Sequence, residues 1–365
     1  MNKNYYFILG SLLGAAAPAC AATITAQTAF STDGFLSPAE NSFLAAGDHT
    51  RGMAYNPATN SLVVVSRVGG TGSGIIISST GNQTGTLNTT GITGGAIILG
   101  PLGIDDAGVL YASNVASPVS GASAVKVYRW ADQNAAPTVA FTSTNVTAGR
   151  LGDNIAVTGS GISTKVALGE SNSTGTGLRH SFAVLSTLDG SAFTGQLVTF
   201  NAPSAIPPVS SFQRGITFLD SDTVVGAIGA ANGNMTIADF TSLAVGTVVD
   251  TNPQTSGSER LMDITTIAGI NYLATLDSSN STVRVYNFSD PLNPFVEATA
   301  TFTGTVANGN GSGGVSWGPV TADSATLYAL NTNTGIFAYT FQVPEPSVAM
   351  LGLAGLGVLL NRRRK

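Results

Sequence analysis

Two adjoining segments between residues 51 and 66 decide the fold: Arg51-Gly52-Met53-Ala54-Tyr55, then Ser61-Leu62-Val63-Val64-Val65-Ser66 after the polar turn Asn56-Pro57-Ala58-Thr59-Asn60. Asn and Pro favour a tight turn, and β-branched residues favour strands. The second segment is apolar at four successive positions, so both of its faces should be buried. This stretch therefore predicts two antiparallel strands that lie inside a larger β structure.

The same arrangement recurs along the chain. A short strand headed by a small residue leads through a polar turn into a very apolar strand, and third and fourth strands follow. The third strands Val125–Trp130 and Val283–Phe288 share a V-[KR]-V-Y core and alternate with period two. The six copies begin 46 to 64 residues apart, the length of one four-stranded propeller blade, at residues 51, 102, 150, 214, 260 and 314.

The sixth copy lacks a fourth strand, because the chain runs from Gly335–Phe341 directly to Pro344. A spare strand, Thr23–Phe30, lies at the other end of the body. A ring of blades must complete its last sheet and join its ends. We therefore predict an all-β, six-bladed β-propeller closed by this N-terminal strand. A seven-bladed ring with an extra blade near residues 165–210 is the main alternative, and a β-sandwich pair or a β-solenoid are the others.

Composition limits the classes of function. Charged residues make up 10% of the chain against a usual ~25%, and the formal net charge is −5. An acidic chain with no basic stripe in its body is not expected to bind nucleic acid. Low charge with many hydroxyl side chains suits a surface that faces polysaccharide or extracellular matrix. Apolar residues at 43% exclude general disorder and allow a large core.

The last 23 residues have three parts: Val343-Pro344-Glu345-Pro346-Ser347, the uncharged and mostly apolar run Val348–Leu360, and a basic end with Arg362, Arg363 and Arg364. This resembles the PEP-CTERM sorting signal of Gram-negative bacteria in every part. Thirteen helical residues rise only about 20 Å, less than the ~30 Å hydrocarbon core, so the predicted helix would hold weakly. Its basic flank should stay cytoplasmic. The resemblance implies an exosortase, a membrane protease similar to a transpeptidase, as a transient partner that cuts near Pro344–Pro346.

The N-terminus agrees with export. Lys3, the apolar run Tyr5–Ala17 and the small residues Ala19 and Ala21 form the three regions of a signal peptide, with cleavage after Ala21 or one residue later. Lipidation of Cys20, the single cysteine, is the competing interpretation. Three domains follow: a signal peptide at 1–21, a propeller at 22–342 and a sorting signal at 343–365.

Candidate chemistry is sparse. The two histidines, His49 and His180, have no partner at metal or catalytic spacing, and neither a Gly-x-Ser-x-Gly elbow nor a mature cysteine nucleophile is present. We expect no catalytic residue, no metal and no cofactor; aspartate-rich turns could hold Ca²⁺, but they fit turn formation better. Trp130 and Trp317 fit a core position better than an exposed sugar-stacking one.

Charged residues at the blade starts are the exception. Four arginines occupy one repeat position, and three aspartates follow three residues into their strands, where the inner strands should line the channel: Arg51, Arg150, Arg214, Arg260, Asp105, Asp153 and Asp263. Arg–Asp pairing that locks neighbouring blades is one interpretation. The other is a funnel for an anionic sugar or carboxylate, because Arg binds such groups bidentately.

The sequence as a whole favours a non-enzymatic propeller, exported to the outer surface or matrix after transient anchoring in the inner membrane, that binds polysaccharide or another envelope component. It would contact the membrane only through its C-terminal segment before processing. A propeller hydrolase or lyase acting on carbohydrate is the alternative, since glycoside chemistry needs two carboxyls and the blade-start aspartates are the clustered ones.

Overall fold

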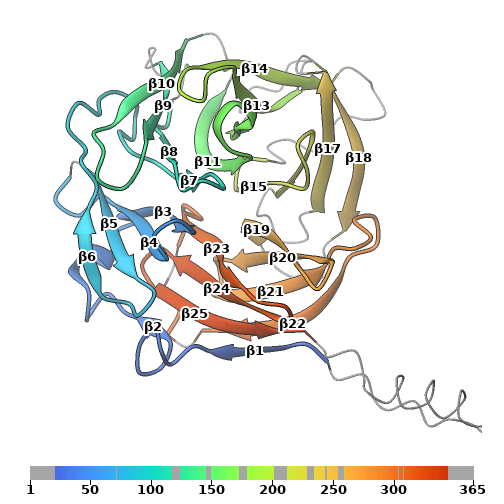
Figure 1. The fold of residues 1–365 in the computed structure, drawn as a ribbon. Helices are drawn as coiled ribbons and strands as arrows, with labels where there is room; N and C mark the ends of the chain where they lie inside the picture. The colour runs from blue at the N-terminus through green and yellow to red at the C-terminus, as the bar shows by residue number, and fades with distance from the viewer. Residues whose placement is uncertain are drawn as a thin grey trace, which may run out of the picture.

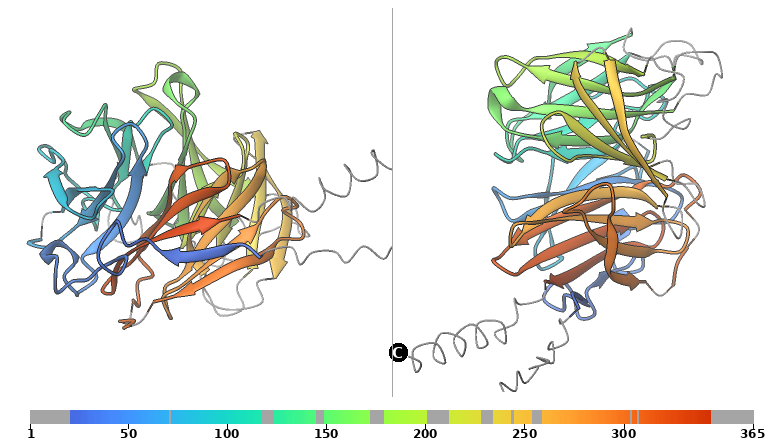
Figure 2. Two further views of the ribbon diagram at one scale, coloured as in Figure 1. Left: turned by 60° about the horizontal axis from the view of Figure 1, so that its bottom comes forward. Right: turned by 90° about the vertical axis from the view of Figure 1, so that its right-hand side faces the viewer.

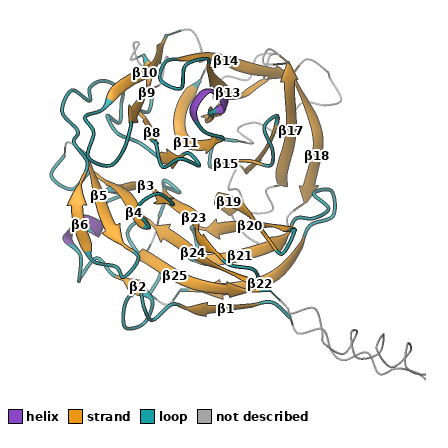
Figure 3. Cartoon of the chain, viewed as in Figure 1, coloured by secondary structure: helices purple, strands orange, loops and turns teal. Residues whose placement is uncertain are grey.

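The computed structural model describes residues 21–343, apart from 71, 117–123, 145–148, 172–178, 201–211, 228–233, 243–244, 254–258, 303 and 307. The described chain is a ring of twisted antiparallel sheets around a central channel (Figure 1). Among the described residues the strands are accompanied by two short 3-10 helices, η1 (Ser42–Leu44) and η3 (Gly161–Ser163) (Figure 3). Both predicted terminal signals, including Ala19, Pro344–Pro346, Arg362–Arg364 and the C-terminal helix, lie outside the described residues.

Six blades, each with four principal strands, make up the ring, and the outer strands of blades 3 and 4 are joined by a parallel bridge between Thr199 and Val245. Blade 1 holds β3 (Thr50–Asn56), β4 (Ser61–Ser66), β5 (Ser73–Ser78) and β6 (Gln83–Thr86). Blade 2 holds β7 (Leu102–Ile104), β8 (Leu110–Ser113), β9 (Val125–Trp130) and β10 (Thr138–Ser143). Blade 3 holds β11 (Arg150–Thr158), β12 (Lys165–Ser171), β13 (Arg179–Thr187) and β14 (Phe193–Phe200).

The other half of the ring repeats the plan. Blade 4 holds β15 (Gly215–Phe218), β16 (Thr223–Ala227), β17 (Asn234–Ser242) and β18 (Val245–Pro253). Blade 5 holds β19 (Glu259–Ile267), β20 (Ile270–Asp277), β21 (Thr282–Asn287) and β22 (Phe295–Thr301). Blade 6 combines β23 (Gly313–Val320), β24 (Ser324–Asn331) and β25 (Gly335–Gln342) with the N-terminal β1 (Thr23–Ala26) and β2 (Phe35–Leu36). The six-bladed prediction is confirmed. A seventh blade is not supported, because β12, β13 and β14 occupy residues 165–200 within blade 3.

The predicted N-terminal strand closes the ring. β1 pairs antiparallel with β25, from Thr23 opposite Gln342 to Ala26 opposite Tyr339, and β2 pairs further along β25. The strand is shorter than predicted, because the chain turns between residues 28 and 34 and Gly34 adopts a left-handed φ of 77° there. Gly34 sits against Gln27 and Ala338, so a Cβ would also crowd this turn.

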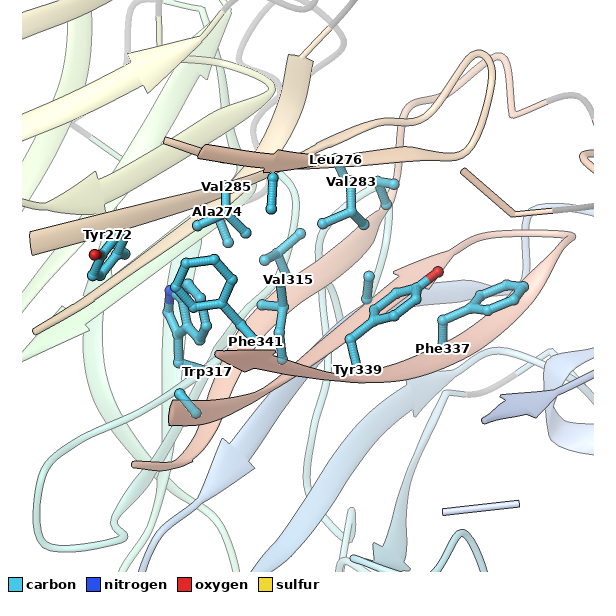
Figure 4. Close-up of a cluster of buried hydrophobic side chains, with 14 of the residues drawn as sticks. Tyr272, Ala274, Leu276, Val283, Val285, Val315, Trp317, Phe337, Tyr339 and Phe341 are labelled. Atoms are coloured by element: carbon cyan, nitrogen blue, oxygen red, sulfur yellow. The ribbon is translucent and has the colours of Figure 1, made fainter. Parts of the chain in front are cut away.

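The core lies between blades. Each pair of neighbouring sheets encloses one buried apolar cluster, and the six clusters complete the circle. Figure 4 shows the cluster between blades 5 and 6, where Phe341 approaches Trp317 and Tyr272 edge-on, at ring-centroid distances of 5.8 and 4.9 Å. Burial of side chains this large contributes roughly 1.5–3 kcal/mol each. Because the clusters are inter-blade, the ring holds together only when it is closed.

The inner strands β3, β7, β11, β15, β19 and β23 run in one direction along the channel, which gives the ring two different faces (Figure 2). The hairpins that join first to second and third to fourth strands lie on one face, called here the hairpin face. The connections between blades, and between second and third strands, lie on the other, called the arginine face. These two faces set the positions of every candidate site residue.

Candidate binding site in the channel

The channel opens at the hairpin face into a cavity of about 400 Å³. Every blade contributes the end of its inner strand to this wide mouth. One lining residue from each blade in turn is Tyr55, Asp105, Thr158, Phe218, Asp263 and Trp317. The lining mixes carboxylates, hydroxyls and aromatic groups, so it can make both polar and stacking contacts.

Asp263 is a carboxylate of the wide mouth whose pKa is shifted strongly by its surroundings. Its Oδ2 accepts a hydrogen bond of 2.8 Å from the Trp317 amide and its Oδ1 one of 2.9 Å from the Ile264 amide. Burial inside the ring raises the pKa of Asp263 to about 6, although both amides favour the charged form. The Trp317 indole also donates to the Asp263 carbonyl at 3.2 Å. The side chain therefore links blade 5 to blade 6.

The Asp105 carboxylate accepts hydrogen bonds from the turn that follows it. Its Oδ1 accepts from the amides of Ala107 and Val109, both at 2.9 Å, and the Thr164 hydroxyl of blade 3 lies 3.4 Å from its Oδ2. The neighbouring Asp106 has a raised pKa because of partial burial and the charge of Asp105. Asp105 thus organises a turn at the wide mouth.

The opposite end of the channel is lined by arginines and defines the arginine mouth, where Arg51, Asp153, Gln213 and Arg214 meet the loop around Asn310. Arg150 Nη2 lies 2.6 Å from Asp153 Oδ1 in the same strand, and Gln213 donates to Asp153 Oδ2 at 3.2 Å. Two further arginines donate to backbone carbonyls of the loop between blades 5 and 6: Arg214 to Asn310, and Arg260 to Asn308 at 3.5 Å.

Neighbouring arginines repel one another at the arginine mouth. The pKa of Arg51 is lowered by burial and by Arg67, while Asp153 and Asp48 oppose that shift and Arg150 adds to it. The pKa of Arg260 is lowered by burial and by Arg214, with Asp277 opposing. The buried Nε atoms of Arg51 and Arg150 have no hydrogen-bond partner among the described residues.

The two faces differ in charge. The body between residues 22 and 343 has ten Lys and Arg residues, and only Arg129 and Lys165 lie toward the hairpin face. The other eight lie at strand ends or loops of the arginine face: Arg51, Arg67, Lys126, Arg150, Arg179, Arg214, Arg260 and Arg284. Hairpin-face turns carry mainly acids: Asp105, Asp106, Asp132, Asp189, Asp220, Asp222, Asp290 and Asp323.

The structure separates the seven predicted channel residues. Arg51, Arg214 and Asp153 line the arginine mouth, with Arg150 and Arg260 bonded beside it, whereas Asp105 and Asp263 line the wide mouth. The ion pair between Arg150 and Asp153 joins residues of a single strand, so it does not lock neighbouring blades. Arg150 thus pairs with an aspartate of its own blade, whereas Arg214 and Arg260 donate to carbonyls of the loop between blades 5 and 6.

The remaining candidates are dispersed. Trp130 is fully buried and its indole donates to the Asn88 carbonyl at 2.7 Å, and Trp317 is also buried, so both are core residues. His49 lies in the loop before β3, where Asp48 accepts from Asn310 and Asn333, both at 2.7 Å. His180 pairs in β13, and its side chain lies outside the described residues. Within the described chain no group of three or more His, Cys, Asp or Glu could hold a metal ion.

Sequence reasoning missed the loop residues of the arginine mouth. Asp48, Arg67, Gln213 and Asn310 come from connections between strands, and only the folded ring brings them to one end of the channel. Asp48 carried a local sequence signal, because Gly47-Asp48 is a turn-forming pair just before the blade start at Arg51, and the structure confirms the turn with a φ of 57° at Asp48.

The folded ends of the body lie together. Thr23 pairs with Gln342, Ala22 and Val343 share the buried cluster of blades 5 and 6, and the Val343 amide donates to the Asp323 carbonyl at 2.8 Å. No helix of the described residues is long and apolar enough to cross a membrane. The predicted signal peptide therefore ends two residues before the strand pair of Thr23 and Gln342, and the predicted sorting signal begins one residue after it.

Comparisons with known proteins support the fold and the sorting signal. The chain resembles a DUF4623 family protein from Bacteroides eggerthii with a TM-score of 0.62, at 16% identity over 85% of this chain and 74% of that one. It also matches a protein of unknown function from Bacteroides thetaiotaomicron at a TM-score of 0.48, with 11% identity over 80% and 69% of the two chains. None of the curated proteins matches this chain.

Residues 342–365 match the family model of the PEP-CTERM protein-sorting motif. The match covers all three parts of the C-terminal segment: Pro344–Pro346, the apolar run and the arginine cluster. Exosortases recognise this motif in exported proteins. The chain is therefore a PEP-CTERM domain-containing protein, an exported and exosortase-sorted chain whose body is a six-bladed β-propeller.

Proposed function

We propose that this protein is a non-enzymatic binding protein of the outer surface or extracellular matrix, and that its arginine mouth holds acidic groups of a polysaccharide. The observation that carries the proposal is the arrangement of four arginines, from blades 1, 3, 4 and 5, around one end of the channel. A bound carboxylate would relieve the repulsion at Arg51 and Arg260, and it would pair with guanidinium groups bidentately.

The division of charge supports the same ligand class. The arginine face carries eight of the ten basic residues, although Arg284 is enclosed in its pair with Glu259, whereas the acidic turns of the hairpin face would repel a polyanion. Such a field concentrates anionic ligands at one mouth of the channel and raises their association rate. Because charges at the rim are screened by salt, binding should weaken as ionic strength rises.

The site carboxylates favour binding over catalysis. Asp105 and Asp263 each accept hydrogen bonds from backbone amides. Asp153 accepts hydrogen bonds from the side chains of Arg150 and Gln213. These bonds fix the carboxylates in structural roles. We propose no cofactor, and the proposed location is the outer surface or matrix, reached through a transient stage in the inner membrane before processing near Pro344–Pro346.

Binding measurements on residues 22–342 test the proposal. A glycan array with acidic polymers such as polygalacturonate, and with neutral dextran as a comparison, should show retention of the acidic class alone. The double variant Arg51→Gln/Arg214→Gln should bind at least about tenfold more weakly and lose part of the salt dependence. Arg129→Gln, on the other side of the ring, is the matched control and should bind normally. Equal retention of dextran, or full affinity in the double variant, would reject the proposal.

A carbohydrate hydrolase or lyase is the second candidate, and Asp263 is the observation that favours it. A buried carboxyl with a pKa near 6 in a 400 Å³ cavity has the properties of a general acid. Incubation of the domain with the polymers retained on the array should then release new reducing or unsaturated ends, and Asp263→Asn should abolish the release. Binding without product supports the non-enzymatic proposal.

A further inference from the structure

Blade 6 is open where every other blade has a hairpin. In blades 1 to 5 the third and fourth strands are joined at the hairpin face, but in blade 6 these strands are β25 and β1. Thr23 and Gln342 therefore occupy the two sides of an unjoined hairpin. β25 ends here at Gln342, and Val343 is the last described residue before the Pro-Glu-Pro sequence of the sorting motif.

The sorting motif has no spacer that would separate it from the fold. Val343 is 5% exposed and its amide is bonded to Asp323, and Pro344 is the next residue. Successive Cα atoms are 3.8 Å apart, so Pro346 can reach at most about 11 Å from Val343. An enzyme that holds Pro344–Pro346 in its active site must then also touch the surface around Val343.

That surface is apolar with an acidic border. β22 lies beside β1, and at the start of β22 Phe295 is 57% and Val296 40% exposed. On the other side Val320 is 45% exposed and precedes the turn that bonds to Val343. The exit surface is defined here by Asp290, Leu292, Phe295, Val296, Val320 and Asp323. These apolar side chains come from the outer strand of blade 5 and the inner strand of blade 6, on either side of Val343, and exposed apolar groups of this size can supply a protein contact.

We propose that the exit surface is the docking site on this protein for exosortase, which would present apolar and basic groups to it. The inference rests on processing near Pro344–Pro346, and not on the ligand proposed for the arginine mouth. Asp290 and Asp323 favour a protein partner over an anionic bilayer, because carboxylates near anionic lipid are repelled. Exosortase thereby reads the folded propeller as well as the short motif.

Pulse–chase measurement of precursor conversion in the producing bacterium tests the inference. Phe295→Asp/Val320→Asp should slow conversion at least about fivefold. The matched control is Val139→Asp/Val249→Asp, which changes two valines that are 52% and 50% exposed on the outer strands of blades 2 and 4. Thermal unfolding of residues 22–342 carrying each pair would verify that both variants fold.

A spacer variant separates docking from other effects. Six Gly and Ser residues inserted between Val343 and Pro344 should restore conversion of the Phe295→Asp/Val320→Asp protein to near the wild-type rate, because the enzyme no longer has to touch the ring. Unchanged conversion without the spacer overturns the inference. Slow conversion that the spacer does not restore also overturns it. A polarity-sensitive probe at Phe295→Cys in full-length Cys20→Ser precursor should stay water-exposed in exosortase-free vesicles; a lipid environment there would assign the surface to the bilayer instead.

Discussion

At the scale of single residues, Asp263 makes stability depend on pH. Its pKa rises from the usual 3.8 to about 6 in the folded ring, so the native state binds this proton more tightly than the unfolded chain. Its contribution is therefore complete below about pH 4 and is lost as pH rises through about 6. The shift corresponds to about 3 kcal/mol. We expect Asp263→Asn to flatten this part of the stability–pH curve, measured by urea unfolding between pH 4 and 7.

The Asn side chain suits that comparison because its carbonyl can still accept from the Trp317 amide. The difference between the two curves isolates Asp263 from other groups that titrate in the same range. Curves that stay parallel between pH 4 and 7 would show that Asp263 titrates normally.

Glu259 and Arg284 form a buried ion pair at the arginine-face end of blade 5. Glu259 Oε1 accepts from Arg284 and Oε2 accepts from the Thr275 hydroxyl at 2.7 Å; the pair is almost completely enclosed. Arg284→Ala should lower the free energy of unfolding by roughly 3–5 kcal/mol, because it leaves a buried carboxylate without its counter-ion.

A double replacement distinguishes lost pairing from lost packing. Glu259→Leu/Arg284→Leu removes both charges and should regain much of the lost stability in urea unfolding. A double variant as unstable as Arg284→Ala would show that side-chain volume, and not the uncompensated charge, decides the effect.

At the scale of elements, the closing strand should control the stability of the whole ring. Residues 22–31 supply β1, the buried Ala22, and Phe30, which is 1% exposed and packs on Tyr328 with ring centroids 5.6 Å apart. Loss of a buried Phe alone costs about 3–5 kcal/mol. Deletion of residues 22–31 should therefore lower the melting temperature clearly, and a synthetic peptide of residues 22–36 should raise it again.

The peptide serves as the control, because recovery shows that the rest of the ring remained competent to fold. If deletion leaves the melting temperature unchanged, then blade 6 is stable without its fourth strand and the closure argument fails.

The strands were predictable from the sequence to a greater extent than the site. The position of each blade follows from its very apolar second strand, such as Ser61–Ser66 in blade 1. A short apolar strand that is buried on both faces must lie inside a larger β structure. The sequence did not predict that Asp153 and Asp263 would lie at opposite ends of the channel. Asp153 and Asp263 stand at the same distance from Arg150 and Arg260, but β11 has an irregular register between Leu151 and Ile155, with Gly152 at φ 92°. Asp153 falls inside that bulge and stays at the arginine mouth, whereas Asp263 pairs regularly with Ala274 and reaches the wide mouth.

At the scale of the whole molecule, the common direction of the inner strands determines which face carries the acidic turns, the wide mouth and the end of the folded chain. The acidic turns, the wide mouth and the end of β25 lie on the hairpin face, and eight of the ten basic residues lie on the other. If the C-terminal segment holds the precursor in the membrane, as the sequence predicts, its attachment point lies on the acidic face. The proposed ligand mouth is then directed away from the attachment point, so polymer binding and sorting need not compete for one surface.

The orientation of that precursor is the last prediction. From Val343 to the start of the apolar run at Val348 the chain spans at most about 17 Å. The eight residues of β23 alone rise about 27 Å along the ring. The tether is too short to let the arginine face turn onto the membrane. In Cys20→Ser precursor held in vesicles, a donor dye at Val320→Cys should therefore transfer energy to headgroup acceptors more efficiently than one at Val68→Cys. Both valines are similarly exposed, at 45% and 40%, but Val68 lies on the arginine face. Equal transfer from the two positions, or stronger transfer from position 68, would show that the exit point does not fix how the propeller faces the membrane.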